Sequence, residues 1–319
     1  MLASLSAGFR SLRRNPGLVL LVLGTNLLLA LVLAVPLAGV LEESLDHTGA
    51  SRRMAEGFDY DWWSAFEARA TGPASAVAPD LLGHGFALRN LDLLLRGTVP
   101  AGLFDRASAP DPAILGAAAL YVLLQLFLPG GILGVVRAPA GGWTFRGLVH
   151  GSGFYFGRMV RVSLIALALA GLLFTAHAPL ARSVDQLAAE AVSERTALAL
   201  AFGRQALLFL ALVALHMVSS HAKVLVVREE RLSAIGAFLS SAAFCLRRLP
   251  AAAGQYAVVG LAGGLLLAAL AFCDARLAPG GFPAQAAALV LFEAFVAGRI
   301  ALRLFLLASQ LELQEGGRA

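Results

Sequence analysis

Long apolar stretches separated by short arginine-rich or polar segments dominate the hydrophobic pattern of this chain. Several exceed the roughly 20 residues that a helix needs to cross a ~30 Å hydrocarbon core. Backbone groups cannot stay unpaired in lipid, so each such stretch is expected to be a helix. The pattern predicts six spans, at 17–41, 113–136, 162–178, 197–222, 251–273 and 285–309.

Shorter segments with apolar residues at helical spacing precede the odd-numbered spans, at 2–14, 144–157 and 233–248. The motif Leu-Arg-Arg-Asn-Pro at 12–16 recurs as Leu-Arg-Arg-Leu-Pro at 246–250, and a weaker copy precedes the third span. The pattern predicts an all-α, polytopic transmembrane bundle of three units, each an interfacial helix followed by a hairpin. The alternative is that any helix entering from the cytoplasm favours arginines and a proline at its start.

Arginine placement predicts the orientation of the spans. Counted over the terminal segment and the short loops, twelve basic residues lie on the side of the termini and three on the other. Basic loops stay in the cytoplasm, so both termini are expected there. Because 24 of the 25 basic residues are arginine and only Lys223 is lysine, we expect a GC-rich bacterial genome and an inner-membrane location. The first apolar run is too long for a cleaved signal peptide.

The 42–112 segment is an acidic insert between the first two spans, with a net charge of −5. We expect it to be extracytoplasmic and mostly helical, with short amphipathic helices at 58–63 and 81–95. Trp62 and Trp63 either lie at the headgroup level or pack the insert onto the span ends. The resulting domains are 1–41 (interfacial helix and first span), 42–112 (insert) and 113–319 (five spans with two interfacial helices).

Composition supports a membrane protein and argues against other classes. Mean hydropathy is +0.77 and 14% of residues are charged, whereas a soluble domain carries about 25%. The basic residues punctuate the spans instead of clustering on one solvated face, so no nucleic-acid partner is predicted. Cys245 and Cys273 bracket one span and are too far apart to pair.

Three stretches carry a resemblance to a known family. They are Phe-Leu-Pro-Gly-Gly-Ile at 127–132, Phe-Tyr-Phe at 154–156 with Arg158, and Ala-Lys-Val-Leu-Val-Val-Arg-Glu-Glu-Arg at 222–231. They resemble uncharacterised six-span bacterial membrane proteins of the domain-of-unknown-function type. The architecture is similar to the membrane domains attached to some glycerophosphodiester phosphodiesterases. The resemblance covers the spans, and without a catalytic domain it does not imply phosphodiesterase activity.

No catalytic, metal or cofactor motif is present. The six histidines are scattered, and no His-Glu-x-x-His, Cys-x-x-Cys or P-loop sequence occurs. The sequence therefore predicts no catalytic residue, no metal ligand and no cofactor.

Polar side chains inside the spans are the candidate binding residues, because intramembrane polar and charged groups usually face the bundle interior or a wet cavity. They are Asn26, Gln125, Arg204 and Glu293. Arg204 and Glu293 are each about 10–12 Å from the outer ends of their spans, which predicts an ion pair, either structural or part of a substrate or proton site. Arg299 and Arg303 are expected to snorkel toward the cytoplasm.

Two functions follow from these features. The first is transport or lipid handling, as a permease-like protein or accessory subunit, with membrane lipids as partners. The second is a scaffold or assembly factor that binds a protein partner through the 42–112 insert. A membrane enzyme ranks third, and the sequence leaves the oligomeric state open.

Overall fold

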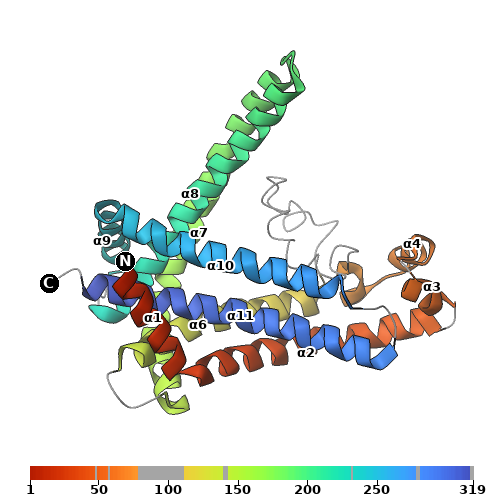
Figure 1. The fold of residues 1–319 in the computed structure, drawn as a ribbon, viewed down its shortest axis with the longest axis horizontal. Helices are drawn as coiled ribbons and strands as arrows, with labels where there is room; N and C mark the ends of the chain where they lie inside the picture. Colours follow the sequence, from red (N-terminus) through yellow and green to blue (C-terminus); the bar gives the residue numbers. More distant parts are fainter. Residues whose placement is uncertain are drawn as a thin grey trace.

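The chain folds as an assembly of helices in the computed structural model (Figure 1). The described residues are 1–46, 49–56, 58–77, 111–138, 143–230, 233–277 and 281–316. Every regular element within them is helical, which confirms the predicted all-α class. The elements are α1 (Leu2–Arg14), α2 (Pro16–Asp46), α3 (Ala50–Glu56), α4 (Tyr60–Glu67), the 3₁₀ helix η1 (Gly72–Ala76), α6 (Pro112–Arg137), α7 (Phe145–Ala189), α8 (Glu194–Arg228), α9 (Ala234–Arg247), α10 (Leu249–Asp274) and α11 (Gly281–Glu315).

Each predicted span falls within one long helix. Within the described ranges, five helices are long and apolar enough to cross a membrane, namely α2, α6, α7, α8 and α10. The sixth, α11, is not among them, and its apolar stretch carries Glu293, Arg299 and Arg303. The fold is thus that of a multi-pass α-helical membrane protein.

Four helices, α2, α6, α10 and α11, run along the long axis of the molecule, and the α7–α8 hairpin leaves them at an angle (Figure 1). We call the end that holds α1, α9 and the last turns of α11 the basal end. The cap, made of α3, α4, η1 and the end of α2, lies at the opposite end (Figure 1). The main hydrophobic core joins residues of α2, α6, α7, α8, α9 and α11.

Helix α7 differs from its prediction. It runs for 45 residues without a break, through Pro179, so 144–157 is not a separate interfacial helix. The residues between that segment and the third span include no glycine or proline, so nothing in the sequence ends the helix there. The spans predicted at 162–178 and 197–222 leave 179–196 as a loop between them. This prediction is also wrong, because α7 and α8 take up all of 179–196 except 190–193.

Helices α6 and α7 cross at a pair of glycines. Gly130 and Gly131 are buried, and a Cβ at Gly131 would overlap the carbonyl oxygen of Leu148 and the hydroxyl of Ser152 on α7. A Pro-Gly-Gly sequence is typical of a kink or a loose helix end, yet α6 continues through it to Arg137. The glycines instead let two helix backbones approach closely.

The aromatic residues of the cap are turned inward. Trp62 and Trp63 are each 7% exposed and pack with Phe66 and apolar residues near the end of α2. The Trp62 indole N–H donates to Ser44 Oγ of α2 at 3.1 Å. These contacts favour the packing alternative for the two tryptophans. Helix α4 confirms the predicted helix at 58–63 in part, and 81–95 lies outside the described residues.

Two separate helices, α1 and α9, occupy the segments 2–14 and 233–248, which confirms that these segments are helical. Helix α1 lies against α10 and α11, with Gly8 packed on Ser309 and Ser4 accepting a hydrogen bond from the Gln255 side chain at 3.2 Å. Helix α9 packs on α8, where the Ser241 hydroxyl donates to the Val218 carbonyl at 2.6 Å.

The α6–α7 crossing gives a first test. Gly131→Ala should destabilise the protein by about 1–3 kcal/mol, the usual cost of overpacking, because the new methyl meets backbone atoms that cannot move aside. Gly134→Ala is the matched control, since a Cβ there meets no atom within 4 Å. Thermal unfolding in detergent measures both, and equal midpoints for the two variants would contradict the close crossing.

Candidate functional site

A cavity of about 300 Å³ opens between α2, α6 and α11. One part of its wall is polar, formed by Asn26, Tyr121, Gln125, Arg299 and Arg303. The rest is apolar, formed by Val22, Leu128, Pro129, Ile132, Val296, Ile300, Leu304 and Leu307. The cavity therefore combines hydrogen-bonding groups with a hydrocarbon-like surface inside the helix bundle.

Helical spacing explains why these polar groups converge. On a helix, residues i and i+4 share a face, and each of the three helices uses this spacing toward the cavity. The pairs are Val22 and Asn26 on α2, Tyr121 and Gln125 on α6, and Arg299 and Arg303 on α11. Three separate helices thus aim polar side chains at one space.

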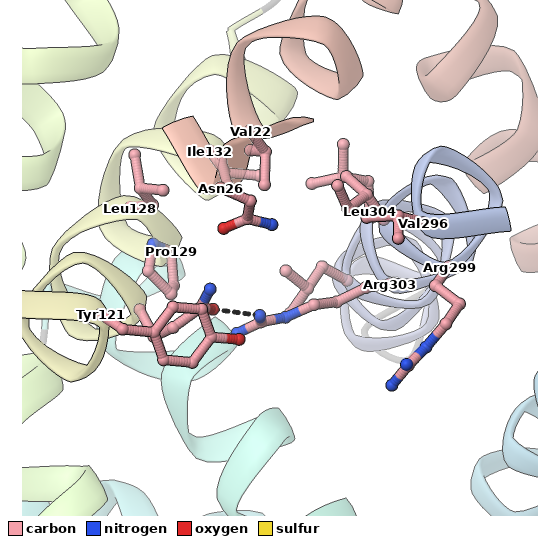
Figure 2. Close-up of a pocket in the computed structure, with 13 residues that line it drawn as sticks. Val22, Asn26, Tyr121, Leu128, Pro129, Ile132, Val296, Arg299, Arg303 and Leu304 are labelled. Carbon is pink, nitrogen blue, oxygen red and sulfur yellow. Dashed lines mark hydrogen bonds between the residues drawn. The ribbon is translucent and has the colours of Figure 1, made fainter. Parts of the chain in front are cut away.

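The Arg303 guanidinium spans the cavity from α11 to α6. Its Nη1 donates a hydrogen bond to Oε1 of Gln125, and the Tyr121 ring lies close beside it (Figure 2). The Asn26 amide points into the space between α2, α6 and α11 (Figure 2). Arg299 leaves the same face of α11, but its guanidinium points away from that of Arg303 and lies 5.8 Å from the Phe295 ring centroid (Figure 2).

The cavity carries positive charge without a compensating acid. None of the described residues that line it is Asp or Glu, while two are arginines. Arg303 precedes Ser309, which packs on α1, by six residues, so it lies about 9 Å along α11 from the level of that contact. An arginine held there by a neutral amide leaves the site electropositive.

The predicted binding residues fall into two groups. Asn26 and Gln125 line the cavity together, as expected of polar groups inside spans. Arg204 and Glu293 do not form the predicted pair. Arg204 Nη1 binds the Asp185 carboxylate and donates to the Ala181 carbonyl at 3.2 Å, both on α7. Within the described residues, Glu293 makes no hydrogen bond or ion pair.

The divergence of the α7–α8 hairpin explains the missing pair. The prediction compared depths along helices assumed to be parallel, but the outer half of α8 faces α7 and not α11 (Figure 1). Asp185 lies between the third and fourth predicted spans, where the sequence predicts a loop, but it belongs to α7. Snorkelling was also wrong for Arg303, since its guanidinium crosses to Gln125. The i, i+4 spacing of Arg299 and Arg303 was the signal that could have placed both on one wall.

A buried amide network behind the cavity was not anticipated. The side chains of Gln255, Gln310 and Gln314 are at most 1% exposed. Gln310 accepts from the Ser220 hydroxyl at 2.7 Å, and Gln314 Nε2 lies 3.0 Å from Nδ1 of His221. These bonds tie α11 to α8 and fix the face of α11 that carries Arg303.

Several kinds of site are not supported by the described residues. Among them, no group of three His, Cys, Asp or Glu side chains could hold a metal ion. Cys245 and Cys273 are free, and burial raises the pKa of the Cys245 thiol on α9 to about 11, which makes it a poor nucleophile. The described wall of the cavity therefore offers hydrogen-bonding groups, and neither of the two cysteines is part of it.

Comparison with known proteins does not assign a family. No family model matches the chain, and neither a curated protein nor a solved structure matches it. The class that the fold and the cavity define is therefore a multi-pass helical membrane protein with an arginine-lined cavity between α2, α6 and α11.

The corrected ion pair can be tested by double-mutant cycles. Arg204→Ala and Asp185→Ala should couple by about 0.5–1 kcal/mol, since the Asp185 side chain is 61% exposed and such pairs contribute little. Arg204→Ala and Glu293→Ala should be additive within about 0.3–0.5 kcal/mol. Thermal unfolding provides the free energies. Stronger coupling of Arg204 to Glu293 than to Asp185 would instead support the ion pair predicted from the sequence.

Proposed function

We propose that this protein handles anionic amphiphiles in a bacterial inner membrane and binds their phosphate headgroups in the cavity between α2, α6 and α11. The observation that supports this function most is Arg303, an arginine at the cavity wall whose hydrogen-bond partner there is a neutral amide. A transport or lipid-handling role follows, because a lipid-derived ligand must enter and leave such a cavity within the bilayer.

The donors in the cavity match a phosphate group. An arginine offers five N–H donors and no acceptor, and the Gln125 carbonyl occupies part of that fork. The Asn26 amide, the Gln125 amino group and the Tyr121 hydroxyl add further donors. Phosphate oxygens are strong acceptors, and charge-assisted bonds to arginine are about twice as strong as neutral ones.

The cost of an arginine inside a membrane supports an anionic ligand. On insertion scales an arginine at the centre of a transmembrane helix costs roughly 2.5–3.5 kcal/mol, and the cost is smaller near a span end, where Arg303 lies. A carboxylate would offset that cost, but no acid lines the described part of the cavity. A bound phosphate would supply the missing negative charge whenever the site is loaded.

The size and lining of the cavity support an amphiphile in preference to a free ion. About 300 Å³ is at the small end for ligand sites, enough for a headgroup and the first methylenes. The apolar wall, which includes Leu128, Ile132 and Ile300, suits the beginning of an alkyl chain. The remainder of the chain would lie in the surrounding lipid.

Lipid binding is the direct test. Purified protein titrated with dioleoylphosphatidylglycerol should bind it more tightly than dioleoylphosphatidylcholine. Arg303→Gln should weaken phosphatidylglycerol binding about 10- to 100-fold, because a hydrogen bond to a charged group contributes about 1.5–3 kcal/mol. Native mass spectrometry measures the occupancies. Arg182→Gln, an exposed arginine near the outer end of α7, is the matched control, and an equal loss in both variants would count against the cavity.

The proposed topology has six spans, including α11, and cytoplasmic termini. In a variant without Cys245 and Cys273, cysteines at Ser51 and Gln285 should react with an impermeant maleimide in spheroplasts, while cysteines at Ser6 and Glu315 should not. All four replaced positions are exposed in the structure, so burial does not decide the result. Labelling of Glu315 together with Gln285 would show that α11 does not cross.

The alternative function is a scaffold that binds a partner through the 42–112 insert. A second cavity, of about 520 Å³, lies between the end of α2 and α4 and offers a place for such a partner. We rank this function second because Trp62, Trp63 and Phe66 turn into the cap. The similarity to the membrane domains of glycerophosphodiester phosphodiesterases likewise stays a proposal.

A further inference from the structure

The second cavity, between the end of α2 and α4, combines charged and hydroxyl groups with an apolar wall. Its volume of about 520 Å³ lies within the usual range for ligand sites. Helix α2 contributes Glu43 and Ser44, and Arg69 and Thr71 come from the segment that follows α4. The hydrogen bond from the Trp62 indole to Ser44 fixes the two helices that form the cavity.

Glu43 and Arg69 bring opposite charges to this cavity without neutralising each other. Both residues are exposed, and within the described part of the chain neither side chain forms a hydrogen bond or an ion pair. Elsewhere in the cap, Arg53 and Asp59 do form an ion pair, at 2.5 Å. A ligand that carries both a cation and an anion would complement the cavity, whereas a ligand with a single charge would leave one of the two side chains unmatched.

The position of Glu43 along α2 corresponds to the level of lipid headgroups. The apolar run 17–41 is centred on Leu29, and a hydrocarbon core of ~30 Å extends about ten helical residues to either side of that centre. The core therefore ends near Gly39, and Glu43 follows about 6 Å farther along the helix, within the headgroup layer. Val40, which also lines the cavity, is 44% exposed and lies at the edge of the core. A lipid whose headgroup enters the cavity can thus keep its acyl chains in the membrane.

A primary ammonium group suits this cavity better than a quaternary one. The Glu43 carboxylate accepts hydrogen bonds, and a quaternary ammonium has no N–H to donate. Proteins recognise quaternary ammonium groups with open aromatic faces instead. Trp62 and Phe66 stack on each other with ring centroids 5.2 Å apart and are 7% and 6% exposed, so they offer little ring surface to a ligand.

We infer that the cap binds the phosphoethanolamine headgroup of a phospholipid, with the ammonium at Glu43 and the phosphate at Arg69. The Thr71 hydroxyl, which lines the same cavity, is a further donor to the phosphate. This site goes beyond the proposed function and does not depend on it, because the cavity between α2, α6 and α11 is lined by other residues. The protein then holds a zwitterionic lipid at the cap and an anionic amphiphile in the bundle.

Two lipids that differ only in the ammonium group test the inference. Dioleoylphosphatidylethanolamine should bind the wild-type protein at least about 10-fold more tightly than dioleoylphosphatidylcholine, because it adds a hydrogen bond to a charged group. Glu43→Gln should reduce this preference to about twofold or less. Glu42→Gln is the matched control, since it removes a neighbouring exposed carboxylate that does not line the cavity. Native mass spectrometry with both lipids present measures the ratio directly.

Arg69→Gln tests the contact with the phosphate. This variant should weaken phosphatidylethanolamine binding by about 10-fold or more, because it removes a charge-assisted hydrogen bond. Arg52→Gln, which replaces an exposed arginine of α3, should leave binding unchanged. All four replaced side chains are exposed, so thermal unfolding midpoints close to that of the wild type should accompany these results.

The possible results separate this inference from the proposed function. If the two lipids bind equally, or if Glu43→Gln keeps the preference, the cap site is wrong and the proposed anion cavity is unaffected. If Arg303→Gln abolishes the preference, phosphatidylethanolamine occupies the cavity in the bundle and the inference is again wrong. If Arg303→Gln leaves phosphatidylglycerol binding unchanged, the proposed function fails while the cap site remains. Glycerophosphoethanolamine should not displace the lipid at comparable concentration, and full displacement would identify a water-soluble zwitterion as the ligand and overturn the lipid site.

Discussion

Side-chain hydrogen bonds between helices at the basal end hold this fold together, because helices inside a bilayer gain little from the hydrophobic effect when they associate. Three buried amides carry these bonds. Gln255 of α10 bonds to Ser4 of α1 and to the Ser309 carbonyl of α11, at 3.2 and 2.8 Å. Gln310 and Gln314 of α11 bond to α8. Four helices are therefore fixed in rotation at one level, and that rotation turns Arg303 into the cavity.

The arrangement gives α11 a central position. One face of this helix carries Arg303, Gln310 and Gln314 in succession. The two glutamines that position the helix therefore lie on the same side of it as the arginine that faces the cavity. Arg228 at the end of α8 donates to the Gln314 carbonyl at 2.7 Å, which secures the last turns of α11. Polar residues set α11 apart from the five helices that are apolar enough to cross a membrane, and the same residues join it to α8 and α10.

The helices could be predicted from sequence, whereas their relative directions could not. Apolar length and the requirement for internal backbone hydrogen bonds placed all six long helices. The same information says nothing about the angle between α8 and α11, which decided that Arg204 meets Asp185 and not Glu293. Asn26 and Gln125 were found because any polar residue inside a span needs an explanation. Arg303 was missed as a cavity residue because it lies near a span end, where a long basic side chain has an easy route to water.

The length of α7 has a consequence for the lipid around the protein. Its 45 residues extend about 67 Å, more than twice the thickness of the hydrocarbon core. Large apolar side chains of the outer half of α8, among them Leu198, Phe202 and Leu210, are more than half exposed. In a bilayer, acyl chains would cover these side chains. The direction of the hairpin would then respond to the thickness of the bilayer as well as to the amino-acid sequence.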